Sequence, residues 1–119
     1  MAYAKKLSGT IAIVTGGAGI LGTEFCKVLA SNGANVAVLD VNREIATQLS
    51  KELQSQYPDS DFLGIGCDLK SEVEIEKAVK RVTNEMGRVD VLVNNAATKT
   101  AELTNFFQPF EDYSLDTWK

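Results

Sequence analysis

The chain has 119 residues, a length that suits one compact domain. Its 45% hydrophobic and 24% charged residues are typical of a folded globular protein rather than a disordered or fibrous one. The net charge of −4 with scattered lysine and arginine excludes the basic stripe that nucleic acid requires, and no apolar run is long enough to cross a membrane.

The residue inventory also narrows the chemistry. The chain has no histidine, which removes histidine acid–base catalysis and most zinc sites, so we expect no metal. Cys26 and Cys67 lie far apart in apolar segments, which favours two small core side chains over a disulfide. The first residues lack the long apolar region of a secretory signal, so we expect a cytoplasmic location.

The first half of the chain predicts two strand–helix units. A short apolar run at Thr10–Val14 indicates a buried strand, and a glycine-rich stretch follows it. The next segment places four apolar residues on one helical face and stops at Asn32-Gly33; these residues are Leu21, Phe25, Val28 and Leu29. A second strand is predicted at Asn35–Asp40. It is followed by an amphipathic helix whose apolar residues recur every four positions until Pro58 bars its continuation, at Ile45, Leu49 and Leu53.

The second half repeats the pattern. A third strand is predicted at Phe62–Cys67, and Ser71 with Glu74 fits a capping box at the start of a helix. That helix carries an apolar stripe that Gly87 closes, at Ile75, Val79, Val82 and Met86. A fourth strand is predicted at Asp90–Asn94.

Strands and helices therefore alternate as βαβαβαβ. Near-continuous apolar strands between helices predict an α/β fold, a doubly wound parallel sheet of the Rossmann type with helices on both faces. We expect one nucleotide-binding half-domain over residues 1–119, with four strands in the order 3-2-1-4. Residues 98–119 lack a clear period and are interpreted as a loop and the start of a helix that leads to a missing catalytic half.

The glycines at 16, 19 and 22 lie between the first strand and the first helix. A dinucleotide pyrophosphate needs this layout, because one glycine permits the turn, one lets the backbone approach the phosphate and one allows close helix–strand packing. The helix N-terminus then presents free N–H groups to the anion. A plain turn before a helix is the simpler alternative. A Walker phosphate loop is excluded, because Thr23 and Glu24 follow Gly22.

Asp40 ends the second strand near the offset expected for an acidic residue that binds the adenosine ribose. Its carboxylate would accept hydrogen bonds from ribose hydroxyls and repel a 2′-phosphate, which favours NAD over NADP as cofactor. The alternative is that Asp40 caps the helix that begins near Arg43.

Four stretches together resemble the short-chain dehydrogenase/reductase family. They are Val14 to Gly22, Leu39-Asp40-Val41, Cys67-Asp68-Leu69, and Val91 to Ala97. The resemblance implies that the glycine loop holds the pyrophosphate, through Gly16, Gly17, Gly19, Ile20, Leu21 and Gly22. It further implies that Asp40 holds the adenosine ribose and that Asp68 and Leu69 border the adenine. Asn94, Ala96 and Ala97 would line the nicotinamide ribose.

Two features depart from the family pattern. The classical branch has its second glycine one place later, where this chain has Ile20, and the present spacing is that of the extended branch of nucleotide-sugar epimerases and dehydratases. The last glycine of the Asn-Asn-Ala-Gly motif is Ala97 here. Because Asn94-Asn95 is typical of the classical branch, we favour a classical-type member with an unusual glycine loop. The alternative is an NAD-binding fragment similar to that of the sugar-nucleotide epimerases and dehydratases.

The family's catalysis needs a tyrosine followed four residues later by lysine, with an upstream serine. The three tyrosines are followed at that offset by Leu7, Asp61 and Thr117, so no catalytic residue is assigned in this chain. We expect the cofactor-binding portion of an oxidoreductase that moves hydride between a nicotinamide and a hydroxyl or carbonyl of a small-molecule substrate, inactive alone. A non-catalytic nucleotide-binding module and a purely structural fragment are the alternatives.

An unpaired edge on the fourth strand is the physical consequence of a four-stranded sheet. Open strand edges beside apolar helix faces promote association. We therefore expect a homo-oligomer formed through this edge.

Overall fold

A computed structural model of the chain describes residues 5–96. Within this part, strands and helices alternate in the order β1 (Ile11–Thr15), α1 (Ile20–Ser31), β2 (Asn35–Asp40), α2 (Arg43–Gln56), β3 (Phe62–Gly66), α3 (Glu72–Met86) and β4 (Val91–Asn94). The predicted loop and helix start at 98–119 lie outside the described residues. None of the described helices has the length and apolar character that a membrane crossing requires.

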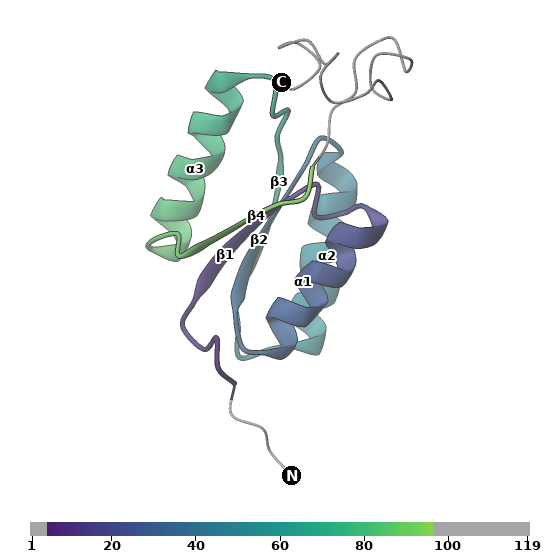
Figure 1. The fold of residues 1–119 in the computed structure, drawn as a ribbon, viewed down its shortest axis with the longest axis vertical. Helices are drawn as coiled ribbons and strands as arrows, with labels where there is room; N and C mark the ends of the chain where they lie inside the picture. Colours follow the sequence, from purple (N-terminus) through teal and green to yellow (C-terminus); the bar gives the residue numbers. More distant parts are fainter. Residues whose placement is uncertain (1–4, 97–119) are drawn as a thin grey trace, which may run out of the picture.

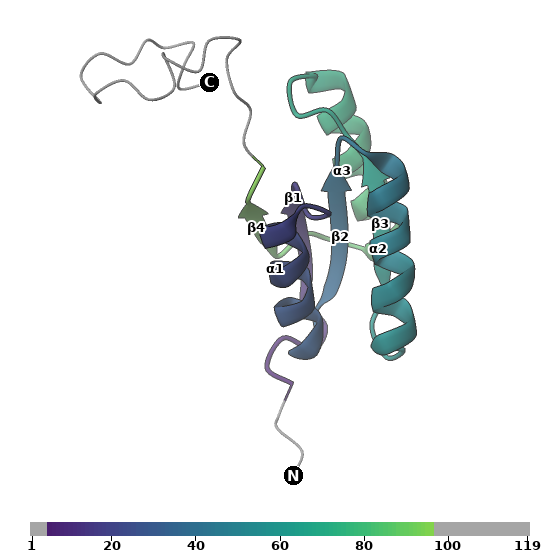
Figure 2. The same ribbon diagram turned by 90° about the vertical axis from the view of Figure 1, so that its right-hand side faces the viewer.

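The sheet confirms the predicted topology. Its strands run in the order β3-β2-β1-β4, and every pair is parallel. Helices α1 and α2 cover one face and α3 covers the other, so the sheet is doubly wound (Figures 1 and 2). The predicted strand limits differ from the observed ones by one residue at four ends, as strand ends commonly do.

Each face of the sheet has its own core. Val14, Val36 and Val38 pack with Cys26 and Leu53 on the side of α1 and α2. Alternate residues of the same strands point to the α3 side, where Ile13, Leu39 and Ile65 are joined by Ala78 and Val82. Because both faces are covered, the strands are apolar almost throughout, which is the pattern that made them recognisable in the sequence.

Helix α1 is confirmed, but its large apolar residues are not the buried ones. The buried residues are Gly22, Cys26 and Ala30. Of the predicted face only Leu29 packs partly against the core, whereas Leu21 and Val28 are each 59% exposed. The small residues lie inward because the helix begins directly over the glycine loop, where there is room only for side chains of that size.

The other helices begin and end as their caps dictate. Asn42, not Asp40, caps α2, since its side chain accepts a hydrogen bond from the Ile45 N–H at 3.2 Å. Ser71 caps α3 through the Glu74 N–H at 3.3 Å. The capping box is half formed, because the Glu74 carboxylate accepts from the Asp68 N–H at 3.1 Å rather than from Ser71.

The start of β4 is tied to the start of β1 by Asp90. Its carboxylate accepts the Ile11 N–H at 2.9 Å and the Arg88 guanidinium at 2.8 Å. Arg88 also donates to the Gly9 carbonyl at 2.8 Å. The backbone N–H of Ile11 and the arginine lower the pKa of the Asp90 carboxyl below its ordinary value. This cluster fixes the register of the last described strand at the end opposite the glycine loop.

Candidate functional site

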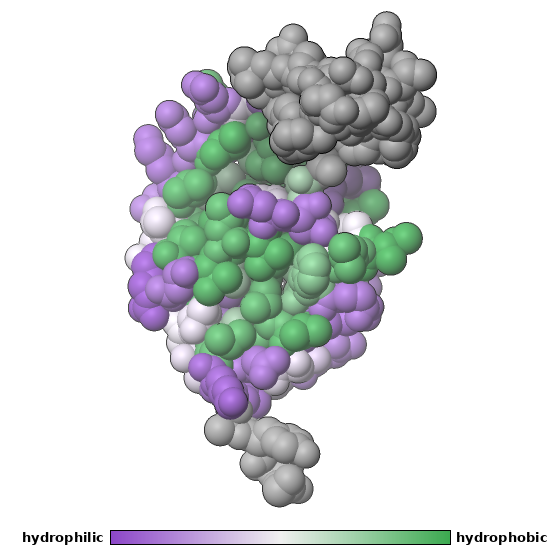
Figure 3. Space-filling view, in the orientation of Figure 1, coloured by the Kyte–Doolittle hydropathy of each residue, from purple (hydrophilic) through white to green (hydrophobic). Residues whose placement is uncertain are grey.

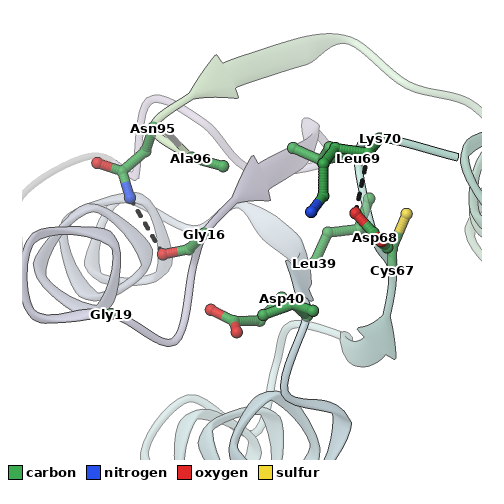
Figure 4. A pocket seen from close by; sticks show the side chains of 11 residues that line it. Gly16, Gly19, Leu39, Asp40, Cys67, Asp68, Leu69, Lys70, Asn95 and Ala96 are labelled. Carbon is green, nitrogen blue, oxygen red and sulfur yellow. Dashed lines mark hydrogen bonds between the residues drawn. The ribbon is translucent and has the colours of Figure 1, made fainter. Parts of the chain in front are cut away.

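A cleft of about 460 Å³ runs along the carboxyl ends of the four strands. Parallel α/β sheets bind ligands at this edge, and the volume lies in the usual range for small-molecule sites. The lining residues come from the loop after β1 (Gly16, Gly19), the end of β2 (Leu39, Asp40, Val41), the segment after β3 (Cys67, Asp68, Leu69, Lys70) and the segment after β4 (Asn95, Ala96) (Figure 4).

Gly16 turns the chain sharply at the floor of the cleft. Its φ of 62° lies in the left-handed region, and a Cβ there would come within 2.9 Å of Cα of Ala96. Gly22 is needed for a different reason. A Cβ at this position would overlap the carbonyl oxygen of Gly16 and lie 2.8 Å from Nδ2 of Asn95. The predicted roles of a turn glycine and a helix-packing glycine therefore fit positions 16 and 22.

Gly19 is the N-cap of α1, and a Cβ there would meet only the Gly16 carbonyl oxygen, at 3.4 Å. No side chain caps the helix, and its first turn holds no acidic residue. The first N–H groups, at Ile20, Leu21 and Gly22, have no carbonyl one turn earlier in the helix to bond. This helix start therefore offers donors and a partial positive charge to an anion.

Gly17 has a different place from its neighbours. Its N–H donates to the Leu39 carbonyl at 3.2 Å, which links the glycine loop to β2. A Cβ at Gly17 would lie 2.8 Å from Cγ1 of Val38. Gly17, Ile20, Leu21 and Gly22 do not line the cleft, so any part they take in binding is through the backbone of the loop and the helix start.

Asp40 holds its carboxylate beside the glycine loop. Oδ2 accepts the Ala18 N–H at 3.2 Å, and Oδ1 accepts the Asn42 N–H at 2.9 Å. An ionised carboxylate has about four acceptor sites, so about two remain for a ligand. Asp40 is therefore oriented by the backbone on both sides and still able to accept from a diol.

The segment after β3 forms the far wall of the cleft. Asp68 and Leu69 both line it, as the resemblance implies. Cys67 also lines it, although its side chain is buried against the α3 core. Burial raises the pKa of the Cys67 thiol, and the carboxylates of Glu74 and Asp68 raise it further, so the thiol stays protonated. Burial also raises the pKa of Cys26, to about 12, and both cysteines are free core residues as predicted.

The segment after β4 is fastened to the loop after β1. The Thr15 hydroxyl donates to the Val93 carbonyl at 3.3 Å and accepts from the N–H groups of Asn95 at 3.1 Å and Ala96 at 3.2 Å. Nδ2 of Asn95 donates to the Gly16 carbonyl at 3.1 Å (Figure 4). The segment after β4, which forms the near wall of the cleft, is therefore held at a fixed distance from the glycine loop.

Six of the twelve predicted site residues line the cleft: Gly16, Gly19, Asp40, Asp68, Leu69 and Ala96. Asn94 ends β4 in register with Thr15 but does not line the cleft, and Ala97 lies outside the described residues. Five further residues line the cleft without having been predicted from the sequence, and each adjoins a predicted one: Leu39, Val41, Cys67, Lys70 and Asn95.

Known proteins resemble this chain in sequence and in architecture. A family model described as short chain dehydrogenase matches residues 10–119. D-threitol dehydrogenase of Mycolicibacterium smegmatis is 34% identical over 113 residues, covering 95% of this chain and 40% of that protein. The NAD(+)-dependent 15-hydroxyprostaglandin dehydrogenase of Homo sapiens is 36% identical over 90 residues, covering 76% of this chain and 34% of that protein.

A solved structure resembles the fold as well. The 3-ketoacyl-(acyl-carrier-protein) reductase of Brucella melitensis, crystallised with NADH, superposes with a TM-score of 0.70 at 30% identity, over 78% of this chain and 36% of that one. The chain thus spans between 16% and 40% of the length of the curated relatives it matches first. The matched family model, the parallel sheet and the glycine-loop cleft agree, and the chain belongs to the short-chain dehydrogenase family of oxidoreductases, with the family's NAD(P)-binding Rossmann fold.

Proposed function

We propose that this chain binds NAD in preference to NADP and forms the cofactor-binding portion of an enzyme that moves hydride between the nicotinamide and a hydroxyl or carbonyl of a small molecule. The observation that carries the proposal is the Asp40 carboxylate. It lies in the cleft, 3.2 Å from the Ala18 nitrogen of the glycine loop, with acceptor sites left over. A carboxylate at this point suits ribose hydroxyls and opposes a 2′-phosphate.

Each part of the dinucleotide has a proposed place. The pyrophosphate would lie at the start of α1, over Gly16 and Gly19, with N–H groups of Ile20 and Leu21 as donors. The adenine would lie between the end of β2 and Asp68-Leu69. The nicotinamide ribose would lie toward Asn94, Ala96 and Ala97. Bound there, the nicotinamide would supply hydride transfer, and the residues described here would bind and orient it.

Calorimetric titration of the chain with NAD, NADH and NADP tests this proposal. NAD is expected to bind more tightly than NADP. Asp40→Asn should weaken NAD about tenfold, because a charged hydrogen-bond acceptor is lost, and should reduce the discrimination against NADP. Asp59→Asn removes the same charge from an exposed loop and should leave both affinities unchanged. Tighter binding of NADP than NAD, or no binding of any dinucleotide, would contradict the proposal.

We also propose that the β4 edge mediates self-association. Among residues 5–96, β4 pairs with β1 alone, and Leu92 on this strand is 54% exposed. Figure 3 shows apolar side chains gathered on the face where Figure 1 places β4. Large apolar residues are also exposed on two helices, Val28 on α1 and Val79 on α3.

Light scattering after size exclusion tests this second proposal. The chain should elute as a dimer or larger species, and Leu92→Lys should shift it toward monomer, since a charge at an edge strand opposes pairing. Val73→Lys places the same charge on an exposed residue of α3 and is the control. A monomer at high concentration would contradict self-association through the β4 edge.

A cytoplasmic location stays a prediction from the sequence.

A further inference from the structure

Lys70 lies on a tightly bonded turn between β3 and α3. Its N–H donates to Oδ1 of Asp68 at 3.0 Å, and the Ser71 N–H donates to the Asp68 carbonyl at 3.0 Å. The Asp68 N–H is in turn held by the Glu74 carboxylate. These bonds place the backbone of Lys70 at the rim of the cleft, so its long side chain starts from a fixed point.

The side chain of Lys70 reaches into the cleft. In Figure 4 its ammonium nitrogen points toward the middle of the space, on the same side as Leu39 and Leu69. Among the described residues that line the cleft, Lys70 is the only basic one, whereas Asp40 and Asp68 are acidic. None of the ion pairs within residues 5–96 involves Lys70.

The charge balance of the cleft gives this lysine a role. Two carboxylates repel an anionic ligand, and the protein as a whole carries a net charge of −4. A dinucleotide brings two negative charges on its pyrophosphate, and NADP adds a 2′-phosphate. The start of α1 offers only a partial positive charge, of about half a unit. An ammonium on a flexible four-carbon stem can reach a phosphate as a point charge with three donors.

We propose that Lys70 contacts a phosphate group of the bound dinucleotide and offsets the repulsion from Asp40 and Asp68. This inference rests on the proposed cofactor binding. The phosphate is either the pyrophosphate, which NAD and NADP share, or the 2′-phosphate, which NADP alone carries. In the second case Lys70 raises the affinity for NADP of a cleft in which the Asp40 carboxylate lowers it, so Lys70 acts as a specificity-determining residue.

Titration of the folded 119-residue chain and its variants with NAD and NADP tests the inference. Lys70→Gln should raise the Kd of at least one dinucleotide by roughly threefold to tenfold, the range of a partly exposed charge contact. Equal losses assign the contact to the pyrophosphate, and a loss confined to NADP assigns it to the 2′-phosphate. Lys70→Arg should retain most of the affinity. The affinity of the unmodified chain should also fall more steeply with salt than that of Lys70→Gln.

Lys51→Gln is the matched control, because it removes the same charge from an exposed position on α2 outside the cleft. Circular dichroism should show that all variants fold alike, since Lys70 is exposed and its structural bond is made by the backbone. If Lys70→Gln binds both dinucleotides as Lys51→Gln does, the inference is overturned while the cofactor proposal stands. If the unmodified chain binds neither dinucleotide, both are overturned.

Discussion

Thr15→Val isolates the hydroxyl that joins the ends of β1 and β4. Valine has nearly the same shape as threonine, so the change removes one oxygen and leaves the packing of a side chain that is 5% exposed. That oxygen donates to Val93 and accepts from Asn95 and Ala96. The variant therefore loses three hydrogen bonds and leaves the Ala96 N–H without its partner, whereas the Asn95 N–H and the Val93 carbonyl still bond each other at 3.1 Å.

The magnitude follows from the exposure of those partners. A fully buried unsatisfied group costs about 1–3 kcal/mol. Ala96 is only half-buried, so water can reach its N–H in part, and about 1 kcal/mol is appropriate for this group. The lost bonds to the Val93 carbonyl and from the Asn95 N–H add about 1 kcal/mol each, and burying one more methyl group offsets about 0.8 kcal/mol. The net loss of unfolding free energy is about 2 kcal/mol, or roughly 8–16 °C in Tm for a domain of this size.

Urea unfolding followed by circular dichroism measures the loss. Thr15→Ser is the matched control, since it keeps the hydroxyl and removes only a methyl group, at about 1 kcal/mol. Dinucleotide affinity should fall more in Thr15→Val than in Thr15→Ser, because the near wall of the cleft is released from the glycine loop. If the valine variant is as stable as the unmodified chain, or more stable than the serine variant, the hydroxyl does not hold this wall.

Two further predictions concern the glycine loop and the far end of the sheet. Gly22→Ala should lower the unfolding free energy by about 2 kcal/mol or more, because the added methyl group overlaps the Gly16 carbonyl. Gly19→Ala should lower it by at most about 1 kcal/mol. Thermal unfolding compares the two variants, and equal losses would disprove the packing role of Gly22. Asp90→Asn should be destabilising at neutral pH. Because the folded state lowers the pKa of Asp90, its contribution is complete above the ordinary carboxyl pKa and disappears as the pH falls through the lowered value, so the stability gap between the two proteins should close in acid. A gap that is constant from neutral pH to acid would contradict this origin.

Local pattern was sufficient to predict the fold and to bring Asp40, Asp68 and Leu69 to the cleft as candidate site residues. The four strands were recognisable in the sequence because both faces of the sheet are covered. Asp40 was recognisable because one strand–helix unit fixes its offset from the glycines. The Thr15–Asn95 link could not be predicted in the same way. It joins residues 80 positions apart, and nothing in the sequence near Thr15 signals that its hydroxyl will accept two N–H groups. Lys70 was overlooked for a related reason, because an exposed lysine before a helix has no pattern of its own.

The wrong prediction of the buried face of α1 and the close packing at Gly22 have one cause. The sequence favoured Leu21, Phe25 and Val28 as one apolar face, because apolar size is the strongest periodic signal. Gly22 lies where any Cβ would overlap the loop, so α1 approaches the sheet closely and only small side chains fit between them, as Cys26 and Ala30 do. The requirement that places the helix start over the cleft thus turns the large apolar residues outward. Leu21 and Val28 are each 59% exposed as a result, which leaves apolar surface on α1 that the proposed self-association would cover.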